Sequence, residues 1–182
     1  MSFEVGAVIL AAGEGRRMGQ PKALLEVGGR TLIEAHVAAL RPIADVVTVV
    51  VRPEVAARLP PLDARVVTRR TASQAESLAA ALEGVDARVW IVTPVDLLPP
   101  QTETLRALLA ALEGVDAVTP LHRGRGGHPA IVRDGVLAPY RTGRLIPLRE
   151  RLAEVARTKL AVDDARVLGD FDVREDVTRL AV

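Results

Sequence analysis

The stretch "VILAAGEGRRMGQPKALLEVGG", residues 8–29, places a glycine-rich and basic loop directly after an apolar run. That run, residues 5–10, does not alternate polar and apolar positions, which predicts a strand buried on both faces. The loop behind it supplies two glycines and three cations: Gly13, Gly15, Arg16, Arg17 and Lys22. Backbone N–H groups of a glycine-rich loop form a concavity for anionic oxygens. The stretch therefore predicts a phosphate-binding loop, and a triphosphate is the ligand that matches it.

Composition predicts one soluble globular domain over residues 1–182, with 49% hydrophobic and 26% charged residues. The 24 basic and 23 acidic residues nearly cancel, so we expect neither nucleic acid nor a membrane among the partners. The sequence has no cysteine, which excludes disulfides and thiolate metal sites. Because it shows neither a signal-peptide pattern nor an apolar run of about 20 residues, we expect a cytoplasmic protein.

Apolar, β-branched runs alternate with helical patterns along the chain. The strand candidates are 5–10, 46–51, 64–68, 87–93 and 116–120, and the helix candidates are 31–40, 73–84 and 101–114. Thr31 and Ser73 open two of these helices as N-caps, each with a glutamate three residues later. Beyond residue 121 we expect a helix over 145–157, a strand near 159–162 and a helix in the acidic tail. This order predicts an α/β fold, a Rossmann-like three-layer sandwich with a mostly parallel central sheet.

Other types of glycine loop fit the opening stretch less well. A P-loop needs glycine-lysine followed by serine or threonine, and this chain has none. A dinucleotide fingerprint opens directly into a helix, whereas here Met18 holds the sixth position and Pro21 interrupts. Arg52 follows the second strand, where a dinucleotide-binding protein carries an acidic residue. An NAD-linked oxidoreductase and a structural turn with solvated arginines remain as alternatives.

The segment "LAAGEGRRMGQPK" (10–22) resembles the signature L-A-A-G-x-G-x-R-M-(x)n-K of nucleotidyltransferases with a Rossmann-like fold. Lys22 follows Arg17 by five positions, which resembles the compact spacing of the MobA-like family of molybdenum-cofactor cytidylyl- and guanylyltransferases. Three further blocks resemble that family in the right order: "TPVDLLPPQTETLRALL" (93–109), "RGGHPAIV" (125–132) and "GDFDVREDV" (169–177). The resemblance covers nearly the whole chain and implies the nucleotide-diphospho-sugar transferase fold.

The resemblance implies nucleotidyl transfer, in which an acceptor phosphate attacks the α-phosphorus of a nucleoside triphosphate and pyrophosphate leaves. Arg17 would stabilise the departing pyrophosphate, Lys22 would contact the α-phosphate, and Asp96 would complete the catalytic set. The implied nucleotide-binding residues are Leu10, Ala11, Ala12, Gly13, Gly15, Arg17, Lys22 and Ser77. Asp96 would bind Mg²⁺, with Asp170 or Asp172 as a second carboxylate. Each aspartate also has a purely structural alternative, as a turn residue or at a solvated helix entry.

A basic, glycine-rich loop follows residue 121 and offers candidates for the acceptor site. Arg123, Arg125 and His128 would contact the acceptor, because two arginines suit a second phosphate, while a structural turn is the alternative for His128. The chain also departs from the family: Leu98 and Arg174 replace prolines. "SQAESL" (73–78) replaces a glycine-serine segment that helps to hold the base, and it keeps only Ser77 of the serine run.

The resemblance favours CMP as the transferred group, because "LAAG" (10–13) resembles the cytidylyl branch whereas the guanylyl branch prefers "LAGG". GMP remains possible. The expected partners are a nucleoside triphosphate, a small phosphorylated acceptor such as molybdopterin, and a molybdoenzyme or other protein of the cofactor pathway. The alternatives are a sugar- or alcohol-phosphate nucleotidyltransferase of the same fold and a non-catalytic nucleotide-binding maturation factor, which the altered 73–78 segment motivates.

Overall fold

A sheet of eight strands organises the chain in this computed structural model, which describes residues 2–13 and 21–168. The strands lie in the order β10–β7–β9–β6–β1–β4–β5, with β8 paired to β7. Their bounds are β1 Ser2–Leu10, β4 Val46–Val51, β5 Arg65–Thr68, β6 Asp86–Pro94, β7 Ala117–His122, β8 Arg125–Gly126, β9 Ala130–Arg133 and β10 Arg157–Ala161. All neighbours are parallel except for the pairs that β9 forms with β6 and β7 and the pair between β7 and β8. The predicted, mostly parallel sheet is confirmed.

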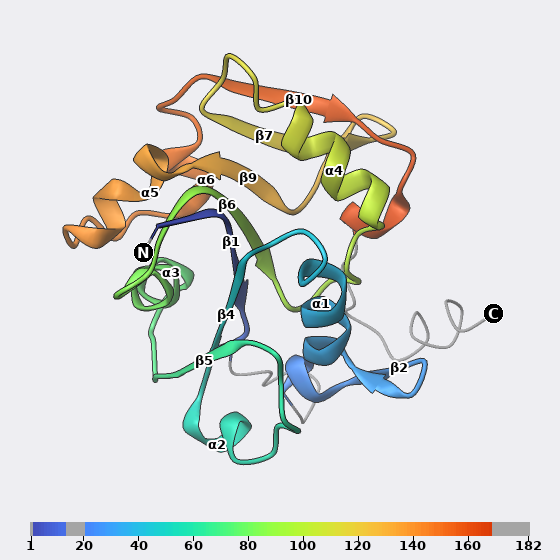
Figure 1. Cartoon of the computed structure of the whole chain (residues 1–182), viewed down its shortest axis with the longest axis vertical. Helices are drawn as coiled ribbons and strands as arrows, with labels where there is room; N and C mark the ends of the chain where they lie inside the picture. Colours follow the sequence, from blue (N-terminus) through green and yellow to red (C-terminus); the bar gives the residue numbers. More distant parts are fainter. Residues whose placement is uncertain (1, 14–20, 169–182) are drawn as a thin grey trace.

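Helices cover both faces of the sheet, which explains the unbroken apolar runs of the sequence. In β1, Ala7 and Ile9 face one hydrophobic cluster and Val8 faces the other, and all three are fully buried. The helices α1 (Leu32–Leu40) and α4 (Thr102–Ala110) pack on the first face. The helices α3 (Gln74–Leu82) and α5 (Asp134–Arg141) pack on the second, so that the sheet lies between two helical layers (Figure 1). The expected three-layer sandwich is therefore confirmed.

Short elements complete the connections between strands and helices. They are η2 (Lys22–Leu24), β2 (Glu26–Val27), β3 (Arg30–Thr31), α2 (Pro53–Ala56), α6 (Leu148–Arg151) and η3 (Ala165–Leu168). The strands β2 and β3 form a small hairpin whose turn is made by Gly28 and Gly29, both with positive φ. Two consecutive residues with φ above zero suit the right-handed twist of a hairpin, and only glycine adopts them without strain.

The predicted helix caps are present. Thr31 and Glu34 form a complete capping box at the start of α1. The Ser73 hydroxyl accepts a hydrogen bond from the Glu76 N–H at the start of α3, but the Glu76 carboxylate accepts from Ala72 N–H rather than from Ser73 N–H. The cap therefore reaches one residue further back and fixes the turn that leads into α3.

The segment after residue 121 differs from the sequence-based expectation. The helix expected over 145–157 is wrong in extent, because α6 covers only Leu148–Arg151. A longer helix, α5, forms at Asp134–Arg141, although it contains Gly135 and Pro139. It forms because Val136, Leu137 and Tyr140 are buried against the sheet, which outweighs the poor helix propensity of the two breakers. The strand expected near 159–162 is β10, at Arg157–Ala161, and the acidic tail lies outside the described residues.

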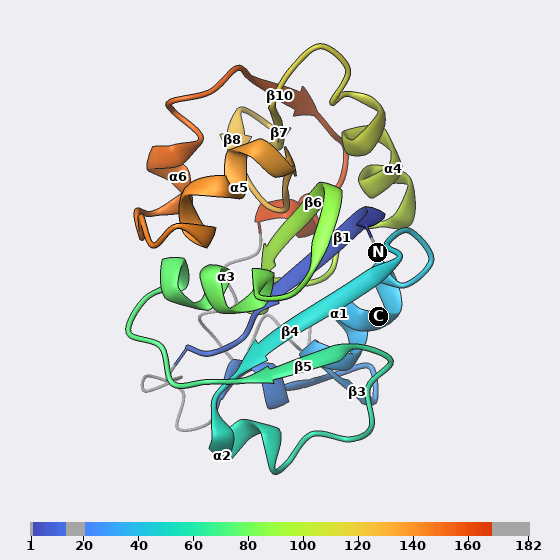
Figure 2. The same ribbon diagram turned by 60° about the vertical axis from the view of Figure 1, so that its left-hand side comes forward.

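The connections from β1 define the position of a ligand site. The chain leaves β1 for β4 on one side, and it later returns to β6 on the other side of β1 (Figure 2). In open sheets with mainly parallel strands, ligands bind beyond the carboxyl ends of the strands at such a point of divergence. The carboxyl ends of β1 and β6 are Leu10 and Pro94, which are paired in register.

Candidate active site

A cleft of about 670 Å³ opens beyond the carboxyl ends of β1 and β6. Six of the eight residues expected to bind the nucleotide line it: Leu10, Ala11, Ala12, Gly13, Lys22 and Ser77. Asp96 lines the same cleft. Gly15 and Arg17, together with the expected metal ligands Asp170 and Asp172, lie outside the described residues. The structure thus gathers the expected residues that it describes, except those for the acceptor, around one space.

Hydrogen bonds hold the loop after β1 between the ends of the neighbouring strands. Ala11 N–H donates to Val50 O at 2.9 Å, and Leu10 O accepts from Val95 N–H at 3.1 Å. Because these bonds continue the parallel pairing on both sides, the backbone at the entrance of the glycine loop has a fixed direction. The loop therefore begins from a rigid base at the edge of the cleft.

Lys22 and Asp96 form the charged centre of the cleft. Lys22 begins η2, directly after Pro21, and Asp96 follows the end of β6. The Lys22 ammonium lies 3.7 Å from a carboxylate oxygen of Asp96, with 23% and 42% of the two side chains exposed. The opposite charges are close but remain accessible to solvent. A phosphate group can contact the ammonium, and a divalent cation can contact the carboxylate.

Arg52 is a cleft residue that the sequence reasoning did not assign. It follows β4, lines the cleft, and donates a hydrogen bond from Nε to Ala12 O at 2.9 Å. Its guanidinium also lies 3.7 Å from Glu54. Arg52 thus ties the loop after β1 to the end of the adjacent strand and adds positive charge to the wall. The one feature of the sequence that could have identified Arg52 as a cleft residue is its position directly after a buried strand.

The N-terminal turn of α3 and the residues just before it form another part of the cleft wall. Thr71, Ser73, Gln74 and Ser77 all line the cleft. The Ser77 hydroxyl donates to Ser73 O at 3.1 Å and is 2.6 Å from the Thr71 hydroxyl. Only 4% of Ser77 is exposed, so this serine holds the turn together and presents little polar surface to the cleft. The more exposed polar side chains of the wall are Ser73 and Gln74.

His36 holds the backbone next to Asp96 through a buried hydrogen bond. It is fully buried in α1, and its Nε2 lies 2.9 Å from Leu97 O, so that nitrogen carries the proton and donates. Burial lowers the pKa of His36 from 6.5 to about 4, although the Leu97 carbonyl and the Asp96 charge favour the protonated form. A neutral imidazole therefore fixes the backbone directly after Asp96. The sequence alone could not reveal this contact, because it joins residues 36 and 97.

A second cavity, of about 400 Å³, adjoins the cleft and shares Leu10, Gln74 and Pro94 with it. His128 lines this second cavity. Arg123 and Arg125 belong to the β7–β8 hairpin and, unlike His128, line neither cavity. The lining includes three cations that the sequence reasoning did not single out: Arg149, Arg157 and Lys159.

The carboxylate that the described part of the cleft offers suits a hard divalent cation. Asp96 offers a partly exposed carboxylate at the end of β6, and Mg²⁺ or Mn²⁺ takes oxygen ligands from one or two carboxylates, phosphates and water. Within residues 2–13 and 21–168, no group of three or more histidines and carboxylates is arranged around a metal position. No described helix is long and apolar enough to span a membrane.

Two curated proteins are similar in sequence to the chain. The bifunctional protein GlmU of Gluconobacter oxydans strain 621H is 32% identical over 168 residues, which are 88% of this chain and 34% of that protein. The 2-C-methyl-D-erythritol 4-phosphate cytidylyltransferase of Thermus thermophilus is 56% identical over 45 residues, which are 24% of this chain and 21% of that protein. The chain thus spans about a third or less of the length of these relatives.

Solved structures show the same fold over the whole chain. A homologue of Mycobacterium tuberculosis Rv0371c from Mycobacterium sp. strain JC1 is 29% identical, has a TM-score of 0.81, and aligns over 97% of this chain and 94% of its own. Rv0371c of M. tuberculosis H37Rv, in a complex with manganese, is 22% identical with a TM-score of 0.79, over 98% of both chains.

A family model also matches most of the chain. The model of the MobA-like NTP transferase domain matches residues 7–161, from the middle of β1 to the end of β10. That range contains every described residue of the cleft. The chain therefore belongs to the MobA-like NTP transferase family.

Proposed function

We propose that the chain is a divalent-metal-dependent nucleotidyltransferase that moves CMP from CTP to a phosphorylated acceptor such as molybdopterin and releases pyrophosphate. GMP from GTP is the alternative donor group. The observation that carries this proposal is the accessible Lys22–Asp96 pair, which lies beside the loop after β1 in a cleft of about 670 Å³. Members of the family bind a nucleoside triphosphate and a phosphorylated acceptor, which supports the same assignment.

The proposed reaction is a single displacement at phosphorus. An oxygen of the acceptor phosphate attacks the α-phosphorus, a new P–O bond forms, and the bond to the bridging oxygen of the β-phosphate breaks. The electron pair of that bond leaves with pyrophosphate. Because the attacking oxygen is already anionic, no general base is needed. Catalysis then requires in-line positioning and compensation of the negative charge that develops on the phosphates.

The residues of the cleft divide these tasks. In this proposal, Lys22 contacts the α-phosphate, and backbone N–H groups of the glycine loop hold the β- and γ-phosphates. Arg17, by its position in the family motif, stabilises pyrophosphate as it leaves. Arg52 holds the loop through Ala12 O. A bound Mg²⁺ or Mn²⁺ would neutralise phosphate charge, and Asp96 is the residue that would hold it.

CMP is favoured over GMP by Ala12 at the third position of the loop, where the guanylyl branch that the sequence resembles less has glycine. The curated cytidylyltransferase from T. thermophilus, 56% identical over 45 residues, supports a cytosine nucleotide as well. The base would lie against the turn at 71–77, where Ser73 and Gln74 offer hydrogen-bonding groups. Two polar side chains on a short helix turn suit a small pyrimidine edge.

The test is pyrophosphate release with each of the four nucleoside triphosphates, Mg²⁺ or Mn²⁺, and a panel of phosphorylated acceptors. We expect CTP with molybdopterin to give the highest rate. The variants Asp96→Asn and Lys22→Met keep the side-chain size but remove a charge, and each should lower turnover by about 10²- to 10³-fold. Arg106→Ala removes an exposed arginine on α4 that lines neither cavity, and it should keep the wild-type rate.

The alcohol-phosphate transferase is a second candidate, because the T. thermophilus relative acts on an erythritol phosphate according to its name. Turnover with 2-C-methyl-D-erythritol 4-phosphate and not with molybdopterin would favour that candidate. Binding of a triphosphate without turnover on any acceptor would favour a non-catalytic nucleotide-binding factor. If calorimetry detects no triphosphate binding in the presence of the metal, the proposed function is wrong.

A further inference from the structure

The charged side chains that line the second cavity are all basic among the residues that the structure describes. Its lining contains three permanent or near-permanent cations, Arg149, Arg157 and Lys159, together with His128, and none of the described lining residues is an aspartate or glutamate. The cavity joins the cleft at Leu10, Gln74 and Pro94. A ligand in the second cavity can therefore reach the end of β1, where the proposed triphosphate binds.

The geometry of the sheet places two of these cations together. Arg157 and Lys159 are two residues apart on β10, so both side chains lie on the same face of the strand. Leu160 lies on the opposite face and packs against the hydrophobic cluster beneath α1 and α4. Lys159 is in register with Thr119 of β7, which also lines the cavity. The strand thus directs a pair of charges to one side.

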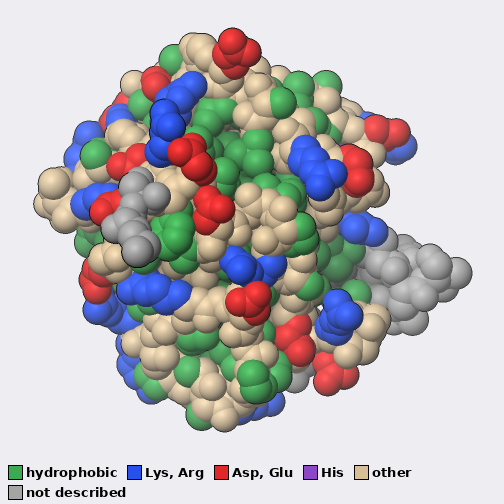
Figure 3. Space-filling model, viewed as in Figure 1, with side chains coloured by type: hydrophobic (Ala, Val, Ile, Leu, Met, Phe, Trp, Pro, Cys, Tyr) green, Lys and Arg blue, Asp and Glu red, His purple; other side chains and the backbone are tan. Residues whose placement is uncertain are grey.

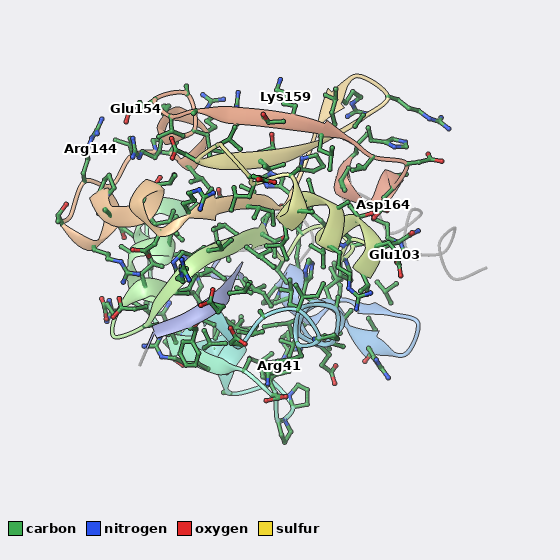
Figure 4. The ribbon with its side chains drawn as sticks, turned by 45° about the horizontal axis from the view of Figure 1, so that its top comes forward. Arg41, Glu103, Arg144, Glu154, Lys159 and Asp164 are labelled. Atoms are coloured by element: carbon green, nitrogen blue, oxygen red, sulfur yellow. The ribbon has the colours of Figure 1, made fainter. Side chains whose placement is uncertain are left out.

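The position of β10 leaves these charges accessible. It is an edge strand that pairs only with β7, and Arg157 and Lys159 are both exposed. Figure 4 shows Lys159 extending from β10 at the outer rim of the molecule. Long side chains at such an edge can reach a ligand without desolvation of the charge in the unbound state. The pair therefore forms a charged rim to the cavity.

Two other arginines of this region form ion pairs with a carboxylate, and the cations that line the cavity differ from them in this respect. Arg144, which lies beside Glu154 in Figure 4, donates to its carboxylate at 2.7 Å. Arg151 donates to the same carboxylate at 3.1 Å. By contrast, Arg149, Arg157 and Lys159 have no carboxylate partner among the residues that the structure describes. Among the described residues, positive charge is thus compensated beside the cavity but not at Arg149, Arg157 and Lys159, which favours an anionic ligand there.

The inner wall of the cavity is apolar. It is formed by side chains from α3, β6, β9 and the α6 region, chiefly Leu78, Val92, Ala130, Leu148 and Leu152. These residues belong to the hydrophobic cluster between the sheet and the α3–α5 layer. A polyol would lose hydrogen bonds to water against this wall without replacing them. A ligand with an apolar body fits the wall, and an anionic group fits the rim.

We propose that the second cavity binds the body of the acceptor, and that the acceptor is a phosphomonoester with an apolar core and a second anionic group. Arg157 and Lys159 contact the second anion, and the reacting phosphate lies at the junction with the cleft. This inference rests on the proposed nucleotidyl transfer. It assigns the recognition of charge to β10 and α6 and not to Arg123 and Arg125, which line neither cavity.

The test uses a matched pair of probes that differ only in the second anion, 4-carboxyphenyl phosphate and phenyl phosphate. Calorimetric titration of the full chain at low ionic strength, with saturating CTP and Mg²⁺, gives the affinity for each probe. We expect the carboxylated probe to bind roughly five- to ten-fold more tightly, because two exposed charge contacts are added. The preference should shrink as salt is raised.

The double variant Arg157→Ala/Lys159→Ala should abolish this preference, so that the two probes bind alike. Thr158→Ala is the control on the same edge strand, at the position between the two cations and on the other face of β10, and it should keep the preference. Circular dichroism of each variant checks that β10 still folds. Equal affinity of the wild-type protein for both probes, or a preference that survives in the folded double variant, would overturn the inference.

Binding of CTP alone separates this inference from the proposed function. If the wild-type protein binds CTP with Mg²⁺ but does not distinguish the probes, the acceptor inference is wrong and the transferase proposal stands. If CTP does not bind, the proposed function is wrong. In that case, a preference for the carboxylated probe, measured without CTP and lost in the double variant, would still support an anion-binding cavity.

Discussion

At the scale of single residues, the buried histidine beneath Asp96 gives the protein a defined response to pH. The pKa of His36 is about 4 in the folded chain because of burial, against 6.5 for an exposed histidine. The unfolded chain therefore binds this proton first as the pH falls. The stabilisation is complete above pH 6.5 and is lost between pH 6.5 and pH 4.

Between pH 7.5 and pH 5 this site alone should lower the free energy of unfolding by about 2 kcal/mol. Urea titration at the two pH values measures the difference. In His36→Gln the amide can still donate to Leu97 O but does not titrate, so this contribution to the pH dependence should disappear while turnover is largely kept. His36→Leu should lose both the pH response and the positioning of Asp96. An unchanged pH dependence in both variants would contradict the assignment.

Arg52 is a second test at this scale, because it links the phosphate loop to β4. The substitution Arg52→Lys keeps the positive charge but cannot donate from the Nε position to Ala12 O. We expect the KM for the triphosphate to rise by about ten-fold, because a charge-assisted hydrogen bond to the loop is lost. Arg58→Lys, at an exposed position beyond α2 outside the cleft, is the control. Equal KM values in the two variants would contradict the assignment of Arg52 to triphosphate binding.

These residues also show how far the sequence could predict the cleft. The loop residues, Lys22 and Asp96 could be named because each stands beside the end of a buried strand and carries an obvious charge or glycine pattern. Arg52 and His36 could not, because their roles depend on which strand lies next to β1 and on what packs beneath residue 97. Such contacts between distant segments are fixed only by the assembled sheet.

At the scale of elements, two nine-residue helices begin with the same kind of cap but serve different purposes. Thr31 caps α1 away from the cleft, whereas Ser73 caps α3 and lines it. Thr31→Ala and Ser73→Ala should each cost about 1 kcal/mol of stability, since each helix loses one side-chain hydrogen bond to a terminal N–H. Thermal denaturation measures this loss.

Only Ser73→Ala should also weaken nucleotide binding, because its loss changes the turn at 71–77 on which Ser77 and Thr71 depend. Calorimetric titration with CTP compares the two variants directly. If both variants bind CTP as the wild-type protein does, the turn before α3 has only a structural role. If Thr31→Ala weakens binding to the same extent, the effect reflects lost stability and not a contact.

The elements that the sequence predicted well are those in which local pattern and packing agree. Both capped helices begin where expected. The α5 helix was missed because Gly135 and Pro139 oppose it locally, and only burial against the sheet stabilises it. The antiparallel direction of β9 could not be predicted from the sequence either. It follows from the reversal of the chain at the turn of Arg123 and Gly124, both with positive φ.

At the scale of the whole molecule, basic and acidic residues nearly balance, with 24 of the first kind and 23 of the second. Figure 3 shows acidic and basic side chains intermingled on one face, without a continuous basic patch. In the proposed function, recognition of anions depends on a few placed cations and not on net charge. The low net charge explains why composition alone could not point to the cavities.

The last prediction concerns the cooperativity of the chain, which we expect to fold as one domain. Trp90, the only tryptophan, lies fully buried in β6, and its Nε1–H donates to Asp134 at 2.8 Å. Its fluorescence reports on the centre of the sheet, whereas far-ultraviolet circular dichroism reports on all helices. In urea the two signals should give one coincident transition, because both helical layers pack on the same sheet.

Gly6→Ala tests this coupling. A Cβ at Gly6 would come within 2.6 Å of the Trp90 ring, so we expect both transitions to shift together by about 1–3 kcal/mol towards lower stability. Gly135→Ala, in α5 with open space around the new methyl group, should not lower stability. Separate transitions, or a Gly6→Ala shift seen only by fluorescence, would mean that the two sides of the sheet unfold independently, and the single-domain expectation would be wrong.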